Sequence, residues 1–345
     1  MNNVIRGALP LIAAAVFAAP LVLWLVYSRR VVSPGGLTAF VEAAAGRPAA
    51  LVHGWIWALA YFLYLPYTIT FVVYDVLPPV FPGIVPYRWP LELLLPVAIV
   101  LLVLAPVRWA LAALLVVGVA QLALLLALGG VELAHLPARL ATAPSVDPVG
   151  RGVGGTALLF ICASLPLYLG AEVRGGSKTV RRGLAAAVGV VGVCFFVAAL
   201  GMATVPDALL RLQVPAVGIA HYYGNRTFGI AVGLGIAAGT LALIVAEYLA
   251  LGRLLHWLHG PPVRRVLLWI AGPFVAADAF SLIDPEGFYD KLLKPSLGAL
   301  FVSQFVVFIV FPLYKRGLRW LPLVAIACGL AGWGFYTLVS GSAST

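Results

Sequence analysis

Apolar residues fill long uninterrupted runs of this chain, and short polar segments separate the runs. A helix that crosses a bilayer needs about 20 mostly apolar residues, whereas a barrel strand needs only about 10. On that rule the sequence predicts about ten spanning helices, at residues 7–27, 51–76, 91–104, 111–128, 156–171, 184–204, 228–251, 266–283, 297–313 and 321–339. We therefore expect an all-α polytopic membrane protein, because a helix pairs its own backbone polar groups inside lipid.

The segments between the runs predict further local structure. Residues 37–45 follow a Pro-Gly-Gly turn and predict a short interfacial helix. Residues 132–151 form the longest polar loop, and residues 206–226 are amphipathic and too polar to cross. Residues 253–265 are rich in Arg and His, and they predict a basic loop.

Composition supports the membrane class. The chain is 63% hydrophobic and 10% charged over 345 residues, with mean hydropathy +1.06, whereas soluble domains carry about 25% charged residues. The formal net charge of +10 comes from basic residues scattered between apolar runs, which is typical of cytoplasmic loops. This scatter is not a basic stripe, so no nucleic-acid partner is expected.

Lys and Arg counts in alternate loops predict the orientation. One side holds about fourteen basic residues and the other about eight, and the positive-inside rule makes the richer side cytoplasmic. We expect a multi-pass protein of the cytoplasmic (inner) membrane with its N-terminus outside.

Residues 152–182 contain the most informative run. Ser164 and Pro166 interrupt it near its middle, and proline removes a backbone N–H and kinks a helix. Unwound backbone at membrane depth is tolerated only where protein covers it or where it lines a watery cavity, and transporters hold substrates at such breaks. Prolines in membrane helices also commonly serve only as bends, so the break is a hypothesis.

A break of this kind would offer backbone groups, small side chains and an aromatic ring to a ligand. The candidate substrate-binding residues are Cys162, Ala163, Ser164, Leu165, Pro166 and Tyr168, with Tyr61 and Tyr64 from the run at 51–76. The alternatives are that the small residues allow close helix packing and that the tyrosines pack in the bundle or lie in interface belts.

Two stretches resemble the amino acid–polyamine–organocation (APC) transporter superfamily. Ser-Pro-Gly-Gly-Leu-Thr-Ala-Phe-Val at 33–41, continuing to Gly54-Trp55, is similar to the Pro-x-Gly-Gly-x-tyrosine-rich segment of that family. Gly-Ala-Glu-Val-Arg at 170–174, followed by Thr-Val-Arg-Arg at 179–182, resembles its Glu-Val-Lys-Asn-Pro…Arg segment. The chain departs from the pattern at Gly175-Gly176, where the family usually has Asn-Pro.

The resemblance implies two inverted five-helix repeats, with substrate between breaks in the first and sixth helices of the family. The sequence shows no counterpart of that first helix. We expect an incomplete first repeat at 7–151, a second repeat at 152–314 and an additional C-terminal helix at 315–345. A start that lies upstream, a partner subunit that supplies the helix, and loss of transport are three explanations that stay open.

Carboxyl groups inside spans are the candidates for ion coupling, because they are costly in lipid. Glu247 and Asp278 are the two best placed; the alternatives are a solvated or paired helix end for Glu247 and an interfacial or hydrogen-bonded position for Asp278. Glu92 is expected in the first turn of a helix, and Glu172 is expected to pair with Arg174. Proton coupling is favoured over sodium, because sodium needs an oxygen cage that the sequence does not supply.

The expected function is that of a secondary transporter of an amino acid or related organic amine, which works by alternating access around the broken helix at Pro166. The alternative is a non-transporting protein of the same fold that serves as a scaffold, sensor or subunit. No nucleophile–base set, phosphate loop, metal spacing or cofactor fingerprint occurs, so neither an enzyme nor a cofactor is expected. The expected partners are the lipid bilayer, the small-molecule substrate, and a second copy or a partner subunit.

Overall fold

A computed structural model of the chain describes residues 3–135, 161–173, 175–201, 205–210, 212 and 214–340. Within these ranges every regular element is helical. Seven helices are long and apolar enough to cross a membrane. The chain is therefore a multi-pass helical membrane protein, and the predicted all-α class is confirmed.

The helices follow one another with short connections. The first half contains α1 (Asn3–Tyr27), α2 (Gly36–Ala45), α3 (Arg47–Thr70), the π-helix η1 (Phe71–Val76), α4 (Leu77–Val80), the 3-10 helix η2 (Pro82–Tyr87), α5 (Arg88–Leu104) and α6 (Val107–Leu133). The second half contains the 3-10 helix η3 (Ile161–Glu172), α8 (Gly176–Gly201), α9 (Asp207–Leu210), α10 (Pro215–Tyr223), α11 (Arg226–His259), α12 (Val263–Ser281), α13 (Pro285–Ile309), α14 (Phe311–Tyr314), the 3-10 helix η5 (Leu318–Trp320) and α15 (Leu321–Val339).

Over the residues that the structure describes, each predicted span coincides with one of these helices, and seven of the helices meet the length and hydropathy expected of a crossing helix. The other three are the runs at 7–27, 156–171 and 266–283. The first coincides with α1, whose side chains are described only from Ala15, and the second is described only from Ile161, as the twelve residues of η3. The third coincides with α12, which carries two arginines and Asp278 within 19 residues.

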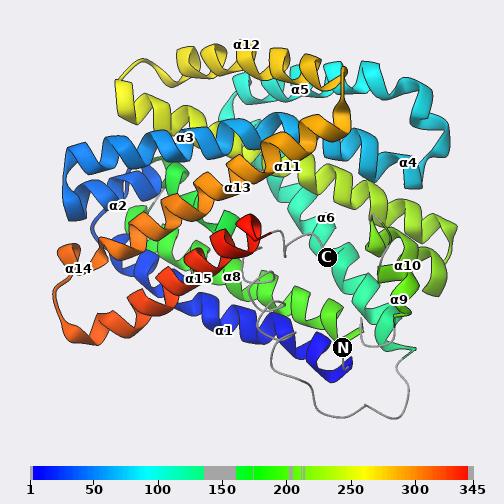
Figure 1. Cartoon of the computed structure of the whole chain (residues 1–345), viewed down its shortest axis with the longest axis horizontal. Coiled ribbons are helices and arrows are strands. Elements are labelled where there is room, and N and C mark those ends of the chain that lie inside the picture. Colours follow the sequence, from blue (N-terminus) through cyan, green and yellow to red (C-terminus); the bar gives the residue numbers. More distant parts are fainter. Residues whose placement is uncertain are drawn as a thin grey trace.

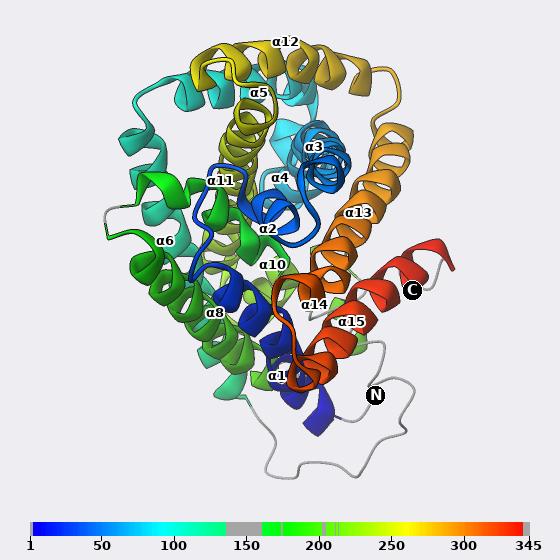
Figure 2. The ribbon, with the colours of Figure 1, turned by 90° about the vertical axis from the view of Figure 1, so that its left-hand side faces the viewer.

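Most of the long helices lie side by side along the long axis of the molecule, and their connections gather at its two ends (Figure 1). Helix α11 is central to this bundle, because it contacts α3, α5, α6, α10, α12 and η3. Figure 2 shows α11 between α6 on one side and α3 on the other. Helices α3 and α13 pack against each other along their length, as do α1 and α8.

Two predicted boundaries were wrong for a common reason. The predicted basic loop at 253–265 is helical through His259, and the predicted span at 297–313 begins earlier, at Pro285. In both places polar residues were taken as the end of a helix. Apolar side chains continue on one face of α11, where Leu254 and Leu258 are buried, so the helix continues.

Helix α2 is where predicted, but it is not a surface helix. Its first six residues, 36–41, are all buried. Gly36 allows this entry because its φ is +51° and a Cβ there would lie 2.6 Å from the Tyr168 ring. The chain therefore turns into α2 directly beneath η3, with no room for a side chain.

Candidate functional site

The predicted break takes the form of a 3-10 helix. Residues 161–172 form η3, with Pro166 inside it. A 3-10 run longer than about four residues is uncommon and often marks a hinge or a strained segment. Pro166 is exposed, whereas Ser164 and Leu165 are buried, Ala163 is half-buried, and the side chain of Cys162 lies outside the described part of the chain.

Two of the predicted aromatic residues meet in the core. The rings of Tyr61 and Tyr168 lie 6.0 Å apart, and Trp57 contacts both, at 4.5 Å from Tyr61 and 6.0 Å from Tyr168. Tyr61 is 3% exposed and Tyr168 is fully buried. This cluster joins α3 to η3 as packing, while Tyr64 packs on Tyr67 with ring centroids 5.1 Å apart.

A polar contact that the sequence did not predict lies one turn before this cluster. His53 is 1% exposed, and its Nε2 lies 3.1 Å from the Ser303 carbonyl. Because a carbonyl only accepts, Nε2 carries the proton, and Nδ1 accepts from the Thr38 hydroxyl at 2.9 Å. His53 therefore joins α3 to α2 and α13.

Glu172 pairs with a different arginine from the one predicted. The Nε of Arg253 in α11 donates to Glu172 Oε1 at 2.6 Å, and its Nη1 donates to the Leu249 carbonyl at 3.1 Å. Arg174, the predicted partner, lies outside the described residues. The ion pair fixes the end of η3 to the central helix.

Glu247 lies well inside α11 and is 2% exposed. Its Oε2 is buried and receives no hydrogen bond from the described residues. The solvated alternative is therefore wrong for this residue. It remains a candidate for ion coupling, as a carboxyl group held in the core of the bundle.

Asp278 is brought together with Glu92, and both are fully buried. Glu92 Oε1 accepts from the Thr70 hydroxyl and from the Ser281 hydroxyl, each at 2.6 Å. Glu92 Oε2 and both oxygens of Asp278 have no hydrogen-bond partner in the described chain. The two carboxyls lie close enough to interact electrostatically. The first-turn position predicted for Glu92 is thus wrong, because α5 begins at Arg88. The residue joins α5 to α3 and α12.

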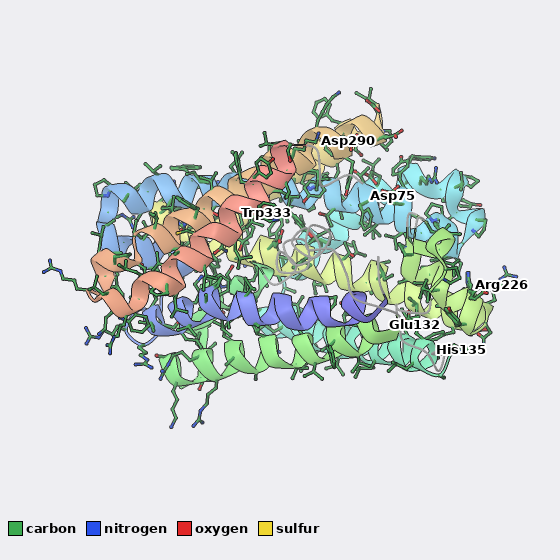
Figure 3. All side chains as sticks on the ribbon, turned by 60° about the horizontal axis from the view of Figure 1, so that its bottom comes forward. Asp75, Glu132, His135, Arg226, Asp290 and Trp333 are labelled. Atoms are coloured by element: carbon green, nitrogen blue, oxygen red, sulfur yellow. The ribbon has the colours of Figure 1, made fainter. Side chains whose placement is uncertain are left out.

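An acidic cavity of about 600 Å³ adjoins this carboxyl pair. It is lined by Thr70, Tyr74, Asp75, Asp284, Pro285, Glu286, Tyr289 and Asp290. Thr70 belongs to both places, because it lines the cavity and donates to Glu92. Six of the chain's twelve acidic residues are therefore in the cavity or directly behind it. Figure 3 shows Asp75 and Asp290 at the same end of the bundle, from different helices.

The two tyrosines of the cavity wall contact further aromatic rings and one cation behind them. Tyr289 packs on Phe71 with centroids 6.1 Å apart and on Tyr67 with centroids 5.5 Å apart. The guanidinium of Arg88 lies 5.1 Å from the Tyr74 ring. Among the described residues, no group of three or more His, Cys, Asp or Glu side chains has the arrangement of a metal site.

The backbone next to the cavity is irregular. Between α3 and α4 the chain forms the π-helix η1, which carries Tyr74 and Asp75 and follows Thr70 directly. Such π-segments widen a helix locally and occur frequently at functional sites. Three of the residues that line the cavity, at 70, 74 and 75, lie in this segment or directly before it.

The sequence contained part of the signal for this site. Asp284, Glu286 and Asp290 form an acid-rich stretch, but it was assigned to a loop between spans. Comparison of the chain with protein-family models and with curated proteins finds no match.

Proposed function

We propose that this chain is a secondary transporter of an amino acid or a related organic amine, coupled to protons. The observation that carries the proposal is the hydrogen-bonded link from the acidic cavity to the buried carboxyls. Thr70 lines the cavity and bonds Glu92, Glu92 bonds Ser281, and Asp278 lies beside them. A cation that enters the cavity is one hydrogen bond away from a group that can exchange a proton.

The cavity fits the amino group of a substrate. Four carboxyl side chains attract an ammonium group, and the faces of Tyr74 and Tyr289 favour a cation through their ring quadrupoles. A substrate without a positive charge would gain nothing from these carboxylates and ring faces. An amine, with or without an α-carboxylate, is therefore the substrate class that this wall favours.

The buried carboxyls fit proton coupling. A carboxyl group inside a membrane bundle is costly, and transporters retain such groups as proton relays. Glu92 and Asp278 lie together in α5 and α12, and Glu247 adds a third group in the central helix. We assign proton exchange to Glu92 and Asp278 and leave Glu247 as a further coupling candidate.

The APC-type inverted-repeat architecture is part of the same proposal. One feature supports it: η3 is irregular where the family has a broken helix. The predicted substrate contacts at 162–168 stay a prediction, and Pro166→Ala tests whether that segment takes part.

The test is uptake by proteoliposomes that contain the purified chain. Radiolabelled putrescine and radiolabelled alanine are offered with and without an imposed pH gradient, and a protonophore serves as the reference for coupling. We expect accumulation that depends on the gradient. The double variant Asp75→Asn/Asp290→Asn should raise KM about fivefold, since two partly solvated ion pairs are lost.

Glu42→Gln is the matched control, because it removes a half-exposed carboxylate on α2, away from the cavity. It should leave KM unchanged. Equal KM values for the cavity variant and the control would show that the cavity does not bind the substrate. No uptake of either compound under any gradient would favour the scaffold, sensor or subunit alternative.

A further inference from the structure

A second charged cavity lies where the end of α1 meets the start of α8. Its volume is about 420 Å³, and it is lined by Leu25, Arg29, Lys178, Arg181, Arg182 and Ala185. Four of the six lining residues are basic, and none is acidic. The start of α8 lies at the same end of the bundle as α2, and α4 lies at the opposite end (Figure 1).

Within the part of the chain that the structure describes, no carboxylate forms an ion pair with these four cations. Among the described residues the ion pairs join Arg47 to Glu42 and Arg253 to Glu172, so neither involves the cavity. Like charges around one space repel each other unless an anion lies between them. The cavity therefore has the charge of an anion site.

Hydrogen bonds hold this arrangement in place. The Ser177 hydroxyl donates to the Ser28 carbonyl, which ties the first turn of α8 to the end of α1. The Nε of Arg181 donates to the Ser177 carbonyl at 3.4 Å. The basic residues are thus brought together by the packing of α8 on α1.

The apolar surroundings identify the kind of anion. Arg182, Ala186, Val190 and Val193 are all exposed, and their spacing of three to four residues places them on one face of α8. Val190 is 52% and Val193 is 61% exposed. This face leads from the cavity along an apolar strip of a membrane helix, as acyl chains require.

We propose that the cavity binds the phosphate headgroup of an anionic phospholipid, whose acyl chains lie along α8. Basic pockets between membrane helices bind lipid headgroups of this class. A free phosphate would satisfy the four cations but would make no use of the apolar strip. The site is independent of the transport function proposed above.

The experiment is native mass spectrometry of the full chain, released from micelles that contain phosphatidylglycerol or phosphatidylcholine. We expect one phosphatidylglycerol retained per chain and no comparable retention of phosphatidylcholine. The double variant Arg181→Gln/Arg182→Gln should lower retention about tenfold. Arg264→Gln/Arg265→Gln is the matched control, because it removes two exposed arginines from the start of α12. Since neither residue lines the cavity, this variant should change retention by less than about twofold.

Three results would overturn the proposal. Equal retention of the two lipids would show that charge is not recognised, and equal losses in the two double variants would show only a general surface charge effect. Competition by millimolar inorganic phosphate as strong as that by phosphatidylglycerol would assign the cavity to a soluble anion. If the double variant does not fold, Arg182→Gln alone replaces it, with an expected loss of about threefold.

Discussion

Asp278→Ala should make the protein more stable and abolish its proton-driven uptake. Asp278 is fully buried in α12, and neither of its oxygens has a hydrogen-bond partner in the described chain. A buried polar group without a partner costs about 1–3 kcal/mol. The substitution removes that cost together with the electrostatic repulsion from Glu92.

The opposing contribution is smaller. Alanine leaves a void of roughly 30 Å³ where the carboxyl was, and a void of that size costs about 0.7 kcal/mol at roughly 24 cal/mol per Å³. The net expectation is a gain of about 1 kcal/mol in the free energy of unfolding. For a chain of this length that corresponds to a rise of about 2 °C in Tm.

Ser281→Ala is the comparison, because it lies one turn away on the same helix and is equally buried. Its hydroxyl donates to Glu92 at 2.6 Å, so its removal should lower stability by about 1 kcal/mol. The two alanine variants are expected to shift Tm in opposite directions. The assay is thermal unfolding in one detergent at one pH, followed by putrescine uptake in proteoliposomes.

The reasoning would be refuted in either of two ways. If Asp278→Ala lowers Tm as much as Ser281→Ala does, Asp278 stabilises the fold and is not retained at a cost. If it raises Tm but leaves gradient-driven uptake intact, Asp278 is not a coupling group. Only a more stable protein that no longer couples supports the assignment.

Two further substitutions test the packing around η3, both by thermal unfolding. Gly36→Ala should lower the free energy of unfolding by about 2–4 kcal/mol, because alanine is strained at a φ of +51° and its Cβ would lie 2.6 Å from the Tyr168 ring. Gly118→Ala is the control, because there is open space around Gly118. Equal Tm values for the two variants would contradict the close approach of Gly36 to Tyr168. Glu172→Gln should cost about 1–3 kcal/mol because it leaves the Arg253 side chain, 5% exposed, without its counter-ion. Arg253→Met should cost less, since the Glu172 side chain is 43% exposed and can be hydrated; the reverse order would contradict this account.

The spanning helices could be predicted because hydropathy alone determines them. A run such as α6, with 27 residues and no acidic side chain before Glu132, has no other stable structure in lipid. The ends of helices were harder. Arg253 was assigned to a loop because charge usually ends a span, yet this arginine is 4% exposed and paired with Glu172 across the bundle.

The candidate site was predicted only in part. Asp278 could be selected because it lies within an apolar run, and an apolar run can be recognised from the sequence alone. Glu92 was interpreted as a first-turn residue because it lies near the end of its run. Whether such a residue faces water or a neighbouring helix depends on which helices pack together. A long-range contact such as Glu92 to Ser281, 189 residues apart, leaves no mark in the local pattern.

Glu92 also suggests how a proton and a substrate would affect the same helices. One of its oxygens accepts from α3 through Thr70 and from α12 through Ser281, while its backbone belongs to α5. Its other oxygen has no partner in the described residues, so protonation there would leave both existing bonds intact. Protonation would, however, remove the charge that strengthens those two bonds, and charge-assisted bonds are roughly twice as strong as neutral ones. Helices α3 and α12 lead directly into η1 and α13, which form the cavity wall. Protonation of Glu92 would therefore weaken the hydrogen bonds that connect α5 to α3 and to α12, the two helices that lead into the cavity wall.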